Sequence, residues 1–206
     1  MLVSHSHKFI FIKPKKVAGT SIQLYLARFC KDGLVYARDP KSHMKAASVR
    51  KLVGEKVWNS YLKVTATRNP WDKTVSLYYW RRRKRPFYIY LKRMLVGKPM
   101  YSLAVRFSFK EFVKELLKLG VLNEDKSITH VDGKLPDYHF IRFEHIHADL
   151  ENLCEKIGET YNPDDMPQKK VGHRKDRSYQ DHFDEETKEC VQMAYDDEIK
   201  LFGYTY

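Results

Sequence analysis

KVAGTS at residues 16–21, shortly after the apolar run FIFI at residues 9–12, predicts a buried strand, a tight turn and a helix start. A second stretch of this kind, RNPWDKTVS at residues 68–76, follows VTAT at residues 64–67. A run of small residues between a strand and a helix collects backbone N–H groups and the positive end of the helix dipole, which together hold a phosphate well. Two such turns indicate a ligand with two separated anionic groups.

The composition fits one soluble domain over residues 1–206 whose surface attracts anions. The net charge is +12, which favours a nucleotide, an acidic or sulfated glycan, nucleic acid or an anionic membrane as partner, without choosing among them. Cys30, Cys154 and Cys190 are odd in number and lie in apolar patterns, so we expect buried thiols in a reducing compartment and neither a disulfide framework nor a zinc site. The sequence has no signal peptide and no membrane-spanning stretch, so we expect a cytoplasmic protein.

Hydrophobic periodicity predicts strands that alternate with helices. Strands are expected at residues 9–12, 34–36, 61–67 and 138–143, and helices at 20–30, 46–54, 69–80, 108–120 and 185–202. A further helix is expected after the last strand, with residues 150–157 on its buried face and Gly158 as its end. Asn69 and Pro70 suit a helix start, and Ser108 with Glu111 has the form of a capping box. This order indicates an α/β fold with a parallel sheet covered on both faces, in which ligands bind at the carboxyl ends of the strands.

In spacing and residue type, the two turns resemble the 5′-phosphosulfate loop and the 3′-phosphate motif of sulfotransferases that use 3′-phosphoadenosine 5′-phosphosulfate (PAPS). The carbohydrate branch, which includes the heparan sulfate 2-O-sulfotransferases and bacterial relatives, is the most similar. RFEHI at residues 142–146 with Asp149, and the endings at residues 178–184 and 197–204, resemble later segments of that family. The resemblance implies a P-loop-like three-layer fold, with a central parallel sheet flanked by helices in a single domain, and a soluble bacterial or viral protein.

Two residues depart from the family pattern. Val17 stands where the family loop commonly has Thr, which removes one hydroxyl contact to the phosphosulfate but keeps the backbone cradle. Lys73 stands where the family often has Arg, which keeps the charge and loses the two-pronged geometry.

The resemblance also implies roles for individual residues. Lys16 would stabilise the leaving 5′-phosphate, and His43 would remove the proton of the acceptor hydroxyl. Arg68 and Ser76 would bind the 3′-phosphate, and Arg174 would lie in a late basic loop at residues 169–177 that folds over the nucleotide. The remaining expected contacts come from the loop residues Val17, Ala18, Gly19, Thr20 and Ser21.

Each of these residues also has an ordinary structural interpretation. Lys16 could be a solvated lysine in a basic run, Thr20 and Ser21 could simply cap a helix, and Arg68 and His43 could be loop residues. Glu144 is more typical of a structural carboxylate than of a catalyst. His145 and His147 could face one metal, but no third ligand is indicated, so no metal site is expected.

The sequence therefore predicts a PAPS-dependent sulfotransferase that transfers a sulfuryl group to a hydroxyl acceptor. The expected acceptor is a carbohydrate, either an anionic or a neutral glycan. An Arg-rich run at residues 81–85, with tyrosines after it, is typical of a solvated face or a nucleic-acid patch and could instead receive an acidic acceptor. Two alternatives stay open: an ATP-dependent phosphotransferase, although the loop lacks the Gly-Lys-Ser/Thr ending, and a basic nucleic-acid binding module, which is less favoured.

Overall fold

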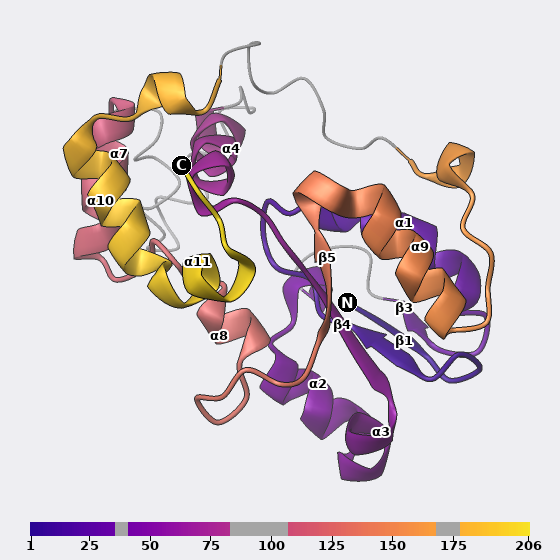
Figure 1. Ribbon diagram of the computed structural model, residues 1–206. Coiled ribbons are helices and arrows are strands. Elements are labelled where there is room, and N and C mark those ends of the chain that lie inside the picture. Colours follow the sequence, from indigo (N-terminus) through magenta and orange to yellow (C-terminus); the bar gives the residue numbers. More distant parts are fainter. Residues whose placement is uncertain (36–40, 83–106, 168–177) are drawn as a thin grey trace, which may run out of the picture. The chain divides into compact units, whose positions relative to one another are not determined.

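The computed structural model describes residues 1–35, 41–82, 107–167 and 178–206 (Figure 1). They belong to two compact units, each with an apolar core of its own. Unit 1 comprises Met1–Arg68 and Glu124–Lys169, and unit 2 comprises Asn69–Asn123 and Lys170–Tyr206. The single domain expected over residues 1–206 stays a prediction.

Unit 1 contains a five-stranded mixed sheet in the order β3-β1-β2-β4-β5. Its central part is parallel, because β2 pairs with β4 and β4 pairs with β5 in the same direction. β1 runs antiparallel to both β2 and β3. The bounds are β1 Leu2–Ser4, β2 Phe9–Phe11, β3 Leu34–Val35, β4 Leu62–Thr67 and β5 His139–Arg142.

The prediction of a wholly parallel sheet is therefore wrong at one edge. β1 was not predicted, and it joins β2 through a turn of four residues at 5–8. So short a connection can link only antiparallel neighbours, since parallel strands need a crossover of a dozen residues or more.

Helices cover both faces of this sheet (Figure 1). Phe9 and Phe11 share one core with α1 (Gly19–Leu26) and α9 (Ile146–Lys156). The alternate residues Ile10 and Ile12 share the opposite core with helices α2 (Ala46–Val53), α3 (Glu55–Ser60) and α8 (Lys126–Thr129). Because successive side chains of a strand point to opposite faces, alternate residues of β2 pack into two different cores. The expected α/β class is confirmed.

The described part of unit 2 is helical. Its core is formed by α4 (Pro70–Arg82), α7 (Phe109–Lys118) and α10 (Glu185–Ala194), with α11 (Asp196–Phe202) packed against it. The capping box of Ser108 and Glu111 is confirmed at the start of α7. The single helix expected at 185–202 is two helices, because the chain leaves helical geometry at Tyr195, whose buried hydroxyl donates to the carbonyl of Leu122 at 2.8 Å.

Candidate anion-binding site

The turn between β2 and α1 has an unusual backbone. Lys16 and Ala18 have left-handed φ angles of +62° and +55°. This conformation costs about 1–2 kcal/mol for a residue with a Cβ, so other contacts must hold the turn. One of them is Val17, whose fully buried side chain anchors the turn in the core beneath α1. The side chain of Val17 therefore faces the protein, and only its backbone can serve a ligand.

The first turn of α1 lacks a side-chain cap. Ala18 is the N-cap, and its carbonyl accepts the N–H groups of Ser21 at 2.9 Å and Ile22 at 3.2 Å. Within the described residues, the backbone N–H groups of Val17, Gly19 and Thr20 donate to no protein acceptor. These amides and the positive end of the helix dipole are suited to bind an anion.

Gly19 is required by the packing of the chain itself. A Cβ at this position would lie 2.9 Å from Cγ of Lys13, whose side chain is only 3% exposed. Nζ of Lys13 donates to Oε1 of Gln23 on α1 at 2.8 Å. The buried position of Lys13 could not be predicted, because Lys13 stands in a run of basic residues that is typical of a solvated surface.

Two acidic residues and one arginine brace the turn. The backbone N–H of Lys15 donates to Oδ1 of Asp125 at 3.1 Å, and its ammonium group pairs with Glu124 at 2.6 Å. Nη1 of Arg68, the residue that follows β4, donates to the carbonyl of Lys16 at 3.1 Å. The structure therefore brings Arg68 to the turn, as the sequence predicts for two neighbouring carboxyl ends of parallel strands.

His43 also contacts this region. Its Nδ1 lies 2.9 Å from the carbonyl oxygen of Lys13. A carbonyl oxygen can only accept, so Nδ1 carries the hydrogen, and in the neutral ring Nε2 holds the lone pair. His43 is half-buried and ends the 3-10 helix Lys41–His43 before α2. This tautomer suits a general base that acts through Nε2.

The carboxyl end of β5 is fixed by an ion pair. Oδ2 of Asp149 accepts the backbone N–H and Nε of Arg142 at 2.8 and 2.9 Å, and Oδ1 accepts Nη2 at 2.7 Å. Burial of the Asp149 carboxyl would raise its pKa, but the bonds from Arg142 outweigh this and lower it. Arg142 of the RFEHI segment and Asp149 therefore hold the strand end, a role that the sequence did not reveal.

Three further residues that the sequence singled out belong to unit 2 or lie outside the described residues. Ser76 is half-buried on α4, in unit 2. Arg174 lies outside the described residues. Lys73 is buried, with Nζ 3.8 Å from Oε2 of Glu198 and 4.9 Å from the ring centre of Tyr195, so it serves the core of unit 2.

The Arg-rich run is described only at its first two residues. Arg81 is 5% exposed and stacks 5.5 Å from the ring centre of Phe112, so its expected place on a solvated or acceptor-binding face is wrong. Arg82 is exposed and donates to the hydroxyl of Tyr78 at 2.6 Å. Residues 83–85 lie outside the described residues.

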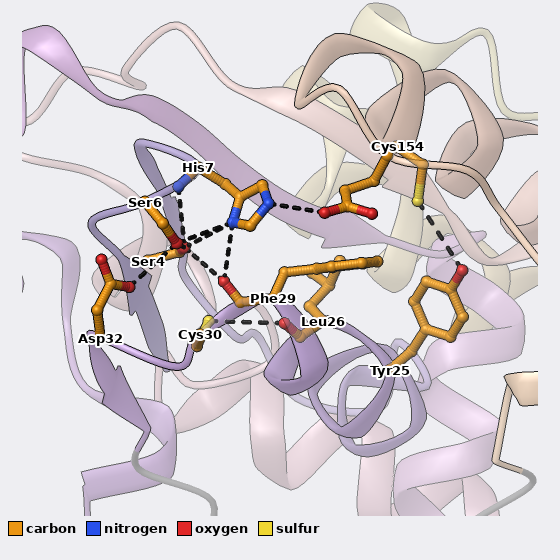
Figure 2. Close-up of polar contacts among 10 residues, drawn as sticks. Ser4, Ser6, His7, Tyr25, Leu26, Phe29, Cys30, Asp32 and Cys154 are labelled. Atoms are coloured by element: carbon orange, nitrogen blue, oxygen red, sulfur yellow. Dashed lines mark hydrogen bonds and ion pairs between the residues drawn. The ribbon is translucent and has the colours of Figure 1, made fainter.

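A second polar cluster in unit 1 has the composition of a hydrolase triad without its geometry (Figure 2). Nε2 of His7 pairs with Glu159 at 2.8 Å, and Nδ1 lies 3.0 Å from Oγ of Ser6. Nδ1 also lies 3.1 Å from the carbonyl of Phe29, which can only accept. Both ring nitrogens thus face acceptors, so His7 holds the β1–β2 turn in place and is no base toward serine.

The three cysteines are free and buried, as predicted. Burial raises the pKa of the Cys30 thiol to about 11, although a bond from Ser4 opposes the shift. Burial likewise raises the pKa of Cys154 and Cys190. Thiols of this kind are poor nucleophiles near neutral pH.

Comparison of the chain with protein-family models, with curated proteins and with solved structures gives no match. Among the described residues, no helix combines the length and the apolar character that crossing a membrane requires. The same part of the chain holds no group of three or more His, Cys, Asp or Glu side chains placed to bind a metal.

Proposed function

We propose that this protein transfers a sulfuryl group from PAPS to a hydroxyl acceptor. The observation that carries the proposal is the left-handed turn at Lys16 and Ala18. Three of its backbone amides donate to no acceptor among the residues that the structure describes, and the Arg68 guanidinium donates to the carbonyl of Lys16. Strained residues persist only where surrounding contacts hold them, and they cluster at functional sites. The resemblance of the two turns to the sulfotransferase motifs is the ground for naming the anion, and it supports a P-loop-like fold for unit 1.

The proposed reaction is an in-line displacement at sulfur. Nε2 of His43 takes the acceptor proton while the acceptor oxygen forms its bond to sulfur. The bond between sulfur and the 5′-phosphate oxygen breaks, and its electron pair stays with that phosphate. Lys16 and the amides of Val17, Gly19 and Thr20 stabilise the growing negative charge. Arg68 binds the 3′-phosphate, with Ser76 as the second ligand that the resemblance implies.

A carbohydrate hydroxyl is the proposed acceptor, on the strength of the resemblance alone. The identity of the sugar is therefore a matter for a screen of glycans, both anionic and neutral. PAPS with a labelled sulfuryl group, incubated with the protein and each glycan in the presence of a chelator, reports transfer without any metal. We expect label in at least one glycan and none with Lys16→Ala.

The same screen decides against the proposal if no glycan or small alcohol is labelled while ATP is consumed in a magnesium-dependent way. That result would support the phosphotransferase alternative. Lys8→Ala serves as the matched control for Lys16→Ala, because Lys8 also has a left-handed φ, +49°, but lies in the turn before β2. Transfer by Lys8→Ala should equal that of the wild type.

A further inference from the structure

Arg68 lies between the anion turn and an aromatic ring. Its Nη1 donates to the carbonyl of Lys16 at 3.1 Å, and its Cζ lies 3.9 Å from the ring centre of Phe143. A guanidinium group on an aromatic face is held by the ring quadrupole and loses less freedom when it makes its other bonds. Phe143 therefore restrains a side chain that joins the end of β4 to the strained residue Lys16.

Phe143 is itself held in place. It begins the 3-10 helix Phe143–His145, directly after Arg142, which Asp149 binds through three hydrogen bonds. Asp149 is 5% exposed in the first turn of α9. A rigid chain of contacts thus runs from α9 through the end of β5 to Arg68 and the turn. All of its members lie in unit 1.

The geometry points to Phe143 as a positioning residue that couples the two anion contacts of the donor nucleotide. Through Arg68 it sets the conformation of the turn that holds the 5′-group, and it orients the guanidinium that receives the 3′-phosphate. The inference rests on the proposed function for the identity of these anions. Because such coupling is reciprocal, an anion on Arg68 should strengthen binding at the turn beyond the sum of the two contacts.

The contact can be tested in the protein without ligand. The amides of Ser21 and Ile22 donate to the carbonyl of Ala18, so their hydrogen exchange reports opening of the turn. Phe143→Leu should speed this exchange by about two- to fivefold, the factor that corresponds to a partly exposed cation–π contact. Phe143→Tyr keeps an aromatic face, so hydrogen exchange at these two amides should equal that of the wild type.

Phe140→Leu is the matched control. Phe140 is also half-buried and lies on β5, but it packs against the opposite core, with α2. It should leave the exchange of Ser21 and Ile22 unchanged. Equal exchange at these amides in folded Phe143→Leu and wild type would overturn the inference. If Phe143→Leu does not fold, Arg68→Lys replaces it. Lysine lacks the planar guanidinium group, so this variant should speed the hydrogen exchange of the same two amides.

The nucleotide measurement separates this inference from the proposed function. Phe143→Leu should weaken binding of 3′-phosphoadenosine 5′-phosphate by about two- to fivefold, and it should weaken binding of adenosine 5′-phosphate less. If the wild type binds neither nucleotide, the proposed function fails, while the exchange data still decide whether Phe143 positions the turn. If the nucleotide binds and Phe143→Leu binds both compounds as the wild type does, the coupling is refuted.

Discussion

Nδ1 of His43 donates a hydrogen bond of 2.9 Å to the carbonyl oxygen of Lys13. This bond ties the 3-10 helix Lys41–His43 to the segment that follows β2, and it fixes which ring nitrogen carries the lone pair. The candidate base is thereby oriented by the same segment that leads into the anion turn. Its backbone partner cannot be removed by mutation, so the ring itself must be changed to test the assignment.

His43→Ala should retain nucleotide affinity and lose sulfuryl transfer by about a hundredfold or more, as expected when a general base is removed. His5→Ala is the matched control, because His5 is an exposed histidine whose ring bonds to the hydroxyl of Tyr61. Initial rates with labelled PAPS and calorimetric Kd values give the two readouts. Near-normal transfer by His43→Ala would assign the base to another residue.

Ala18→Gly should make the protein more stable. Glycine relieves about 1–2 kcal/mol of left-handed strain and loses about 0.5–1 kcal/mol through its greater freedom in the unfolded chain, which leaves a net gain of up to about 1.5 kcal/mol. Ala47→Gly, in the right-handed helix α2, should instead lower the free energy of unfolding by about 1 kcal/mol. Urea unfolding of both variants measures the difference, and a loss of stability in Ala18→Gly would contradict the strained turn.

Asp149 should make the stability of unit 1 sensitive to acid. Its pKa in the folded protein lies below the ordinary value of 3.8, since the bonds from Arg142 outweigh the effect of burial. The unfolded chain therefore binds the proton more readily, so the stabilisation is complete above pH 3.8 and is lost as the pH falls through the folded pKa. Asp149→Asn should lower the free energy of unfolding at pH 7 by about 1–3 kcal/mol.

Unfolding curves recorded between pH 7 and pH 3 test this prediction. The difference in stability between wild type and Asp149→Asn should shrink toward the acid end. A difference that stays constant over this range would mean that the charge of Asp149 does not stabilise the end of β5.

The Asn69 side chain should contribute to stability through three hydrogen bonds, two that cap α4 and one to the C-terminal segment. Its Oδ1 accepts the N–H groups of Trp71 and Asp72 at the start of α4, and its Nδ2 donates to the carbonyl of Thr205. Asn69→Ala should lower the free energy of unfolding by about 1–2 kcal/mol, the range for loss of an N-cap. Asn69→Asp keeps the capping oxygen and should lose less. Equal losses in the two variants would show that capping is not the main contribution.

Strong local signals made most of the fold predictable. The Phe9–Phe11 strand, the helix start at Asn69 and Pro70, and the capping box at Ser108 each combine a hydrophobic pattern with a specific terminal residue. β1 could not be predicted because Leu2–Ser4 holds only two apolar residues, and its pairing with β2 and β3 is fixed by tertiary structure. The break between α10 and α11 at Tyr195 could not be predicted either, because the hydroxyl of Tyr195 bonds to Leu122, a residue far away in the sequence.

The candidate site was predictable in its location and less so in its details. Lys16 and Arg68 follow two strands that prove to be neighbours, so the parallel pairing of β2 and β4 brings them together. The supporting contacts of Lys13 and Phe143 arise only in three dimensions. A lysine in a basic run and an aromatic beside an arginine have no pattern that distinguishes them from ordinary surface residues.

Calorimetry with two nucleotides in the presence of a chelator tests the central claim most directly. The wild type should bind 3′-phosphoadenosine 5′-phosphate more tightly than adenosine 5′-phosphate, because Arg68 adds a charged hydrogen bond of about 1.5–3 kcal/mol, roughly a factor of 10 to 150 in Kd. Arg68→Ala should lose most of this preference. Equal affinity of the wild type for the two nucleotides, or binding that requires magnesium, would contradict the assignment of a PAPS-dependent sulfotransferase.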